Sequence, residues 1–297
     1  MKNQYFGDVG DYGKYGMLRY FAKNNIKIAV NWYLTPDDGS NDGRHITYLE
    51  KDSMERYDPE LFAILKQMVF NGQRNVMAFE NADMIPNAVY YNCLLNDEGA
   101  SRIEKRAFRE KWHKDALSAC KGAELVFLDP DNGVCEIEPK SAKDSIKYCY
   151  ADEIADYFYT GQNVVYYCSK GRRTYEQWEE MKALMKRRIP ESRIVVITFH
   201  KGTQRSYIFV LHQEYFRKYA ELIKRFLRCW YNIFTEEWGK VGKLDGEKTG
   251  EKFHVSDSRG VELTIEECED GWVNIHFSDQ KNMLHRISID HLVSKLR

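Results

Sequence analysis

The most constraining feature of the chain is an apolar run that stops abruptly at a pair of acids. Residues 122–133 read GAELVFLDPDNG, in which the apolar run 125–128 is followed by Asp129 and Asp131. A continuous apolar run of this kind is typical of a strand buried on both faces of a parallel sheet. Pro130 and Gly133 then end the predicted strand, because both residue types interrupt regular structure.

The acids at this strand end indicate a functional site. Ligands of open α/β sheets bind beyond the carboxyl ends of the strands. A plain Asx turn is the alternative, and Asp, Asn and Gly are sufficient for it. Such a turn has no need of two acids beside a buried strand end, where burial of a carboxylate is costly. The candidate catalytic residues are Asp129, Pro130, Asp131 and Asn132.

Strands and helices alternate along most of the chain. A Gly-rich lead at 5–16 is expected to precede a helix that begins with MLRYFAKN. Strands are predicted at 26–34, 75–79, 123–128, 163–168, 193–199 and 206–212, and helices at 59–70, 101–119, 152–159, 174–188 and 213–233. The gap between the last two strands is too short for a helical crossover, so they form an antiparallel hairpin. The fold class is therefore α/β, a doubly wound and mostly parallel sheet with a closing antiparallel hairpin.

The chain is expected to divide into a large domain, 1–238, and a small β-rich C-terminal module, 239–297. A linker rich in Gly and Lys covers 240–252. Short strands are predicted at 252–256, 260–266 and 272–277, and a helix at 289–296. So few residues rarely make an independent core. We therefore expect the module to dock on the large domain or to mediate a homo-oligomer.

Composition narrows the function classes. The net charge is −1, so any contact with nucleic acid depends on a local basic patch. Seven cysteines are scattered without a C-x-x-C pair, which favours reduced thiols in the cytoplasm. The polar N-terminal residues and the lack of a long apolar run predict neither a signal peptide nor a membrane span. Neither a Walker A loop nor a G-x-S-x-G elbow is present.

Two short motifs and their order resemble a known family. Asp11-Tyr12-Gly13-Lys14 precedes a helix and the strand IAVNWYL, and a later strand ends in Asp129-Pro130-Asp131-Asn132. Over about residues 3–235 the chain resembles Rossmann-like S-adenosylmethionine-dependent methyltransferases, which also close their sheet with an antiparallel insertion. It is similar in particular to the large-subunit rRNA adenine-N6 methyltransferases and the three-Cys-motif partner proteins.

The resemblance implies a transferase that uses S-adenosylmethionine and acts on nucleic acid or a nucleotide. Methyl transfer from a sulfonium needs an amine held in line, with its protons accepted. Asp129 and the Pro130 carbonyl would accept them, and Lys14 would bind the cofactor carboxylate. The implied cofactor-binding residues are Lys14, Asp37, Asp38, Gly39 and Asn41. The chain departs from the family at Asn132, where the family has an aromatic residue that stacks on the base.

A basic segment follows the predicted strand 163–168. Because it leaves the same edge of the sheet as Asp129, we predict that it contacts a substrate phosphate. An ordinary solvated loop is the alternative. The residues concerned are Ser169, Lys170, Arg172 and Arg173.

Two other functions fit the same sequence. Asp37, Asp38 and Asp42 could face Asp129 and Asp131, and such an acidic cluster suits Mg²⁺ or Mn²⁺. The chain would then be a metal-dependent nuclease or phosphodiesterase. The third hypothesis is a non-catalytic Rossmann scaffold, because fold does not fix function.

Overall fold

The computed structural model describes residues 1–40, 42–135, 140 and 144–237, together with the backbone of four C-terminal strands. The chain divides into two compact units, Met1–Glu237 and Trp238–Arg297, and each is described by itself. The boundary predicted from the sequence lies one residue later. No helix in the described part of the chain is long and apolar enough to cross a membrane.

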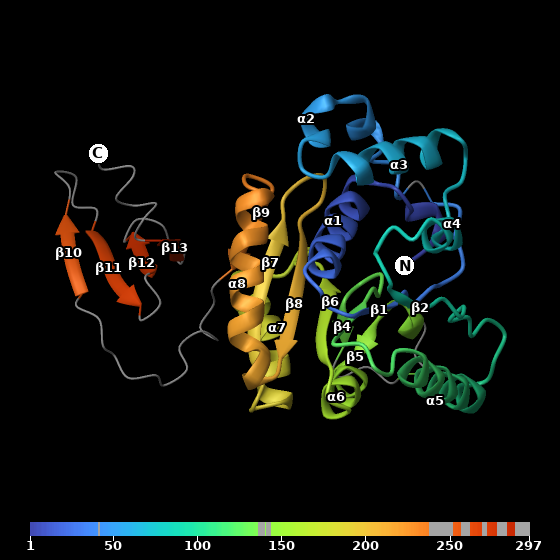
Figure 1. Ribbon diagram of the computed structural model, residues 1–297. Coiled ribbons are helices and arrows are strands. Elements are labelled where there is room, and N and C mark those ends of the chain that lie inside the picture. Colours follow the sequence, from blue (N-terminus) through green and yellow to red (C-terminus); the bar gives the residue numbers. More distant parts are fainter. Residues whose placement is uncertain are drawn as a thin grey trace. The chain divides into compact units, whose positions relative to one another are not determined.

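The first unit is built on a seven-stranded sheet (Figure 1). The strand order is β2-β1-β3-β6-β8-β7-β9. The strands are β1 (Ile28–Asn31), β2 (Val89–Tyr91), β3 (Leu125–Leu128), β6 (Asn163–Cys168), β7 (Arg193–Phe199), β8 (Arg205–Leu211) and β9 (Phe234–Glu237), and a separate parallel pair is formed by β4 (Val134–Cys135) and β5 (Cys149–Tyr150). β3 pairs in parallel with β1 and β6, whereas β8 pairs antiparallel with both β6 and β7. The predicted fold class, the central position of β3 and the closing hairpin are confirmed.

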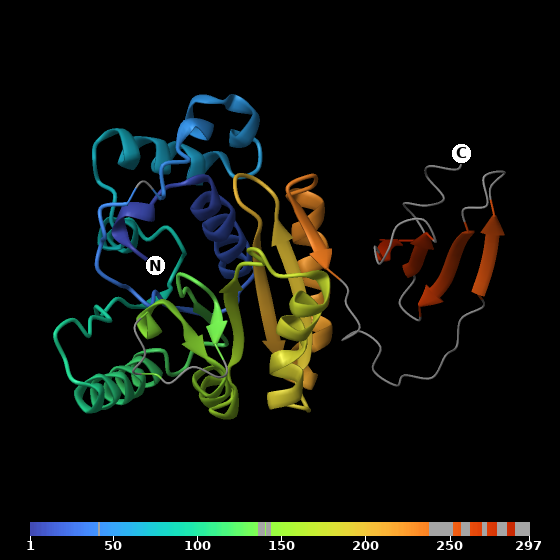
Figure 2. The same ribbon diagram turned by 180° about the vertical axis from the view of Figure 1, so that it is seen from behind.

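Helices cover both faces of the sheet (Figure 1, Figure 2). The α-helices are α1 (Val9–Lys23), α2 (Asp52–Glu55), α3 (Pro59–Phe70), α4 (Val76–Asn81), α5 (Arg102–Ala119), α6 (Ala151–Tyr159), α7 (Tyr175–Arg188) and α8 (Gln213–Cys229), with 3-10 turns at Asn3–Tyr5, Thr47–Glu50 and Ser145–Lys147. Along β3, Leu125 and Phe127 pack in the core beneath α1 and α8. Val126 and Leu128 pack in the opposite core, beneath α5, α6 and α7. This two-sided burial explains why the strand is apolar throughout.

Several local predictions were wrong. The segment 75–79 is not a strand: Asn75 caps α4 by accepting a hydrogen bond from the Ala78 N–H (2.8 Å), and Met, Ala and Glu favour helix over strand. Strands β2 and β9 were not predicted. The Gly-rich lead is helical from Val9 onward, because Asp8 accepts from the Gly10 and Asp11 amides as an N-cap.

Three glycines let α1 pack closely against the sheet and α8. Gly10, Gly13 and Gly16 recur every three residues, so they share one face of the helix. A Cβ atom on Gly13 would lie 2.6 Å from the Phe199 ring, and one on Gly16 would overlap the Trp230 ring. The Gly-rich segment that was expected to precede the helix is therefore part of it and forms a packing surface.

The second unit contains an antiparallel sheet in the order β10-β11-β12-β13. Its strands are β10 (Lys252–Ser256), β11 (Glu262–Cys268), β12 (Trp272–Phe277) and β13 (Leu284–Ser288). Three of these strands were predicted, with β11 displaced by two residues, and β13 was not. The predicted helix at 289–296 lies outside the described residues.

Gly16→Ala is expected to lower the free energy of unfolding by about 1–3 kcal/mol, because the added methyl group overpacks the contact with Trp230. In an exposed helix the same change would stabilise the protein. Urea unfolding of Gly16→Ala, Trp230→Phe and the double variant measures the effect. The double variant should lose less than the sum of the single changes. Strict additivity would show that the two side chains do not share this space.

Candidate functional site

The site predicted from the sequence lies where the strand order reverses. β2 and β3 flank β1 on opposite sides, and such a switch point opens a crevice beyond the carboxyl ends of the strands. β1 ends at Asn31 and β3 ends at Leu128. The Asp129 amide donates to the Asn31 carbonyl (3.0 Å), so the two segments leave the sheet side by side.

A buried lysine joins the two sequence motifs at this edge. The Lys14 ammonium on α1 lies 2.6 Å from Asp129 Oδ2 and 2.7 Å from Asp11 Oδ1. Burial alone would lower the pKa of Lys14, but the two carboxylates outweigh it and raise that pKa above its usual value. For Asp11, burial is the larger effect and raises the pKa of the carboxyl. The Lys14 ammonium thus forms two ion pairs, and both are with carboxylates of the protein itself.

Three oxygen atoms converge on a single nitrogen beside this ion pair. The Met1 nitrogen lies 2.6 Å from Asp131 Oδ1, and it donates to the main-chain carbonyls of Asp129 (2.9 Å) and Tyr33 (3.2 Å). We call these three acceptors the amine cradle. Thr35 Oγ1 donates to the other Asp131 oxygen (3.2 Å). The sequence predicted the Pro130 carbonyl as an acceptor at this turn. The acceptor in the cradle is instead the carbonyl of Asp129, one residue earlier, and Pro130 itself is buried.

Tyr33 was not predicted as a site residue. Its φ of +44° is rare for a residue with a side chain, and such strain is concentrated at functional sites. Asn31 Oδ1 accepts from the Tyr33 amide (3.1 Å), and Tyr33 Oη donates to Glu153 Oε2 (3.2 Å). These two bonds fix the Tyr33 carbonyl in the amine cradle. The sequence gives no periodic signal for this role, because Trp32-Tyr33-Leu34 simply continues an apolar strand.

The predicted cofactor loop contacts the N-terminal residues. The Gln4 amide donates to Asp37 Oδ1 (3.0 Å), and the Gln4 side chain donates to Asp38 Oδ1 (2.9 Å). Lys2 also donates to Asp38 and thereby lowers the pKa of that carboxyl. Gly39 adopts a positive φ of +68°. Asn41 lies outside the described residues.

The five acids proposed for a metal do not form a shared ligand set. Lys2 stands between Asp38 and Asp131, with its ammonium 3.9 Å from Asp131 Oδ2. Asp42 is exposed. Among residues with described side chains, no group of three or more His, Cys, Asp and Glu is placed to hold a metal ion.

The basic segment 169–173 lies beside the Asp129 turn. A Cβ atom on Gly133 would lie 2.8 Å from Cys168 Sγ at the end of β6, so the turn that follows β3 touches the end of β6. Arg173 Nη1 donates to the Ser169 carbonyl (2.7 Å), and Ser169 Oγ accepts from the Gly171 amide. These bonds shape the turn itself. Lys170 is half-buried and Arg172 is exposed. Asn132, also half-buried, donates its amide to the Lys147 carbonyl (2.9 Å).

A second buried ion pair supports Tyr33 from behind. Arg109 on α5 donates to both Glu153 oxygens on α6 (2.8 and 2.7 Å). Burial would raise the pKa of Glu153, but Arg109 lowers it to about 2. A sequence signal did exist, because Arg109 shares the buried face of its helix with Trp112 and Ala116.

Lys14→Met is expected to lower the free energy of unfolding by about 3–5 kcal/mol, because it leaves Asp11 and Asp129 buried without a cation. Lys23→Met on the same helix is the matched control, since Lys23 is exposed and pairs with Glu60 at the surface. The control should cost less than about 1 kcal/mol. Urea unfolding measures both, and equal losses would contradict the burial argument.

The low pKa of Glu153 predicts a loss of stability in acid. A carboxyl whose pKa is about 2 in the folded state and 4.5 ordinarily stabilises the protein above pH 4.5, and this contribution is lost as the pH falls toward 2. The unfolding free energy should therefore fall more steeply below pH 4.5 in the wild type than in Arg109→Met/Glu153→Gln. Unfolding curves at a series of pH values test this, and parallel slopes would refute it.

No family model matches the chain, and no curated protein matches it. Among solved structures, the crystal structure of protein LPL1258 from Legionella pneumophila strain Philadelphia 1, of the family DUF519, is similar with a TM-score of 0.41 and 14% sequence identity. The match covers 79% of this chain and 97% of that one.

Proposed function

We propose that the chain is an S-adenosylmethionine-dependent methyltransferase that acts on an amine of a nucleic acid or a nucleotide. The observation that carries the proposal is the amine cradle at the carboxyl edge of β1 and β3. Its acceptors are one carboxylate oxygen, from Asp131, and the carbonyls of Asp129 and Tyr33. A neutral base amine has two N–H protons, so two of these acceptors are enough to hold it and leave its lone pair free to face a sulfonium.

The cofactor fits the charge of this edge. S-adenosylmethionine supplies a methyl group on a cationic sulfonium. This edge of the sheet already holds three nitrogen cations, those of Met1, Lys2 and Lys14, against the acids Asp38, Asp129 and Asp131. A ligand cation that displaced one of them would find its counter-charge in place. The residues that would hold the cofactor are those of the segment 35–40 and the Asp129 turn.

Lys14 takes a different role in this proposal from the one the resemblance implies. Its ammonium is bound by Asp11 and Asp129, so it fixes the orientation of Asp129 instead of binding the cofactor carboxylate. Asp129 in turn positions its own carbonyl in the cradle. The Met1 nitrogen fills the cradle in this structure, so a substrate amine must displace it.

The charges at this edge of the sheet allow a direct test of cofactor binding. Calorimetry should detect binding of S-adenosylmethionine and of its neutral product, S-adenosylhomocysteine. Asp131→Asn keeps the side-chain shape but removes a charge, so it should weaken the cationic ligand more than the neutral one, by roughly fivefold.

Asp42→Asn, the same change at an exposed position of the loop, should leave the ratio of the two affinities unaltered. The absence of heat with either ligand up to millimolar concentration would reject the proposal.

A further inference from the structure

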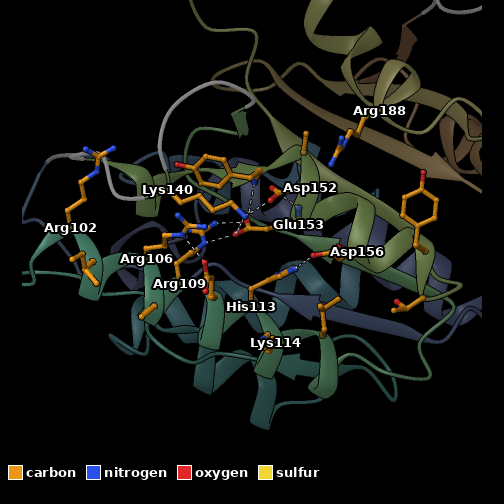
Figure 3. Close-up of a pocket in the computed structure, with 18 residues that line it drawn as sticks. Arg102, Arg106, Arg109, His113, Lys114, Lys140, Asp152, Glu153, Asp156 and Arg188 are labelled. Carbon is orange, nitrogen blue, oxygen red and sulfur yellow. Dashed lines mark hydrogen bonds and ion pairs between the residues drawn. The ribbon is translucent and has the colours of Figure 1, made fainter.

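A large groove lies between α5 and α6 (Figure 3). Its volume is about 1540 Å³, and its lining runs from Arg102 to Leu117 on α5 and from Tyr150 to Thr160 on and around α6. Sites for single small molecules measure about 300–1,000 Å³. The dimensions therefore suit an extended ligand better than one small molecule.

The groove is basic although the chain as a whole is not. Six Lys and Arg side chains line it against four Asp and Glu, whereas the whole chain has a net charge of −1. Three of the acids are compensated within the groove, through the pairs Arg106–Glu110, Arg109–Glu153 and Lys140–Asp152, and Asp156 contacts the His113 ring. Lys114 and Arg188 are exposed and make no ion pair with any residue that the structure describes. The surplus positive charge is thus available to an anion.

Exposed cations of α5 form a row along the groove. Arg102, Arg106 and Lys114 are exposed and are separated by four and eight residues, so they share one face of α5. The row is about 18 Å long at the rise of an α-helix. Tyr159 lines the same groove and is 62% exposed, and an exposed aromatic ring is a platform on which a base stacks. A repeated negative charge with flat bases matches this surface.

The inner wall of the groove reaches the amine cradle. Glu153 lines the groove and accepts from Tyr33 Oη, and the Tyr33 carbonyl is one of the three cradle acceptors. One side chain therefore separates the two sites.

We propose that the groove between α5 and α6 binds the sugar–phosphate backbone of a single-stranded nucleic acid. The binding claim stands alone, and only its role in presenting an amine for methylation rests on the proposed function. Phosphate contacts by Lys and Arg give affinity without sequence preference.

Fluorescence anisotropy with the full chain and a labelled single-stranded RNA of about 12 nucleotides tests the proposal. Arg106→Glu/Lys114→Glu should weaken binding by at least about tenfold and make the salt dependence shallower by about 0.7 in slope for each lost phosphate contact. The matched control is Lys111→Glu. Lys111 is on the same helix and also pairs with an acid four residues on, Asp115, but it does not line the groove.

Each outcome decides the proposal. Weak binding in the groove variant together with near wild-type binding in the control supports it. Equal losses in both variants, no RNA binding by the wild type, or competition by polyglutamate as strong as by unlabelled RNA would overturn it. The affinity for a DNA strand of the same sequence shows whether the groove distinguishes ribose from deoxyribose.

S-adenosylhomocysteine binding, measured on the same samples without RNA, separates the two proposals. The groove variant should bind it as the wild type does. RNA binding without any affinity for S-adenosylhomocysteine would leave the groove standing and reject the methyltransferase function.

Discussion

The ion pair between Lys14 and Asp129 is the interaction on which the site depends. It crosses from α1 to the end of β3 and is buried at both ends. Burial of two opposite charges is costly unless their geometry is good and further bonds satisfy them. Asp11 supplies the second contact to Lys14. α1 can reach this position because Gly10, Gly13 and Gly16 let it approach the sheet and α8 closely.

The same constraint explains what could be predicted from the sequence. The run 125–128 must be covered on both faces, so β3 and its terminal acids were predictable from hydrophobicity alone. The hairpin of β7 and β8 followed from the length of its connection. Helix α1 was predicted to start too late because glycine has low helix propensity, and only tertiary packing reveals why glycines are needed there. Likewise, the apolar residues after Asn75 suggested a strand, but Asn75 caps a helix there.

The candidate site was predicted in part. Asp129, Asp131 and Lys14 come together as the motif order suggested, whereas Asp37 and Asp38 contact Lys2 and Gln4. Tyr33 was missed because its role depends on a positive φ and on its carbonyl, which no pattern of residue types reveals. Arg109 and Glu153 were missed because their meaning comes from burial between two helices distant in sequence. Both residues line the α5–α6 groove, and Glu153 also accepts the hydrogen bond from Tyr33, whose carbonyl belongs to the amine cradle.

Transfer of a methyl group to nucleic acid is the central claim, and nucleoside mass spectrometry tests it most directly. Single-stranded RNA and DNA would be incubated with the full chain and S-adenosylmethionine that carries a deuterated methyl group, then digested to nucleosides. The account predicts deuterated methyl on an amine of a base, and loss of that label with Asp131→Asn but not with Asp42→Asn. Absence of deuterated nucleosides from both nucleic acids, with the cofactor shown to be bound, would contradict it.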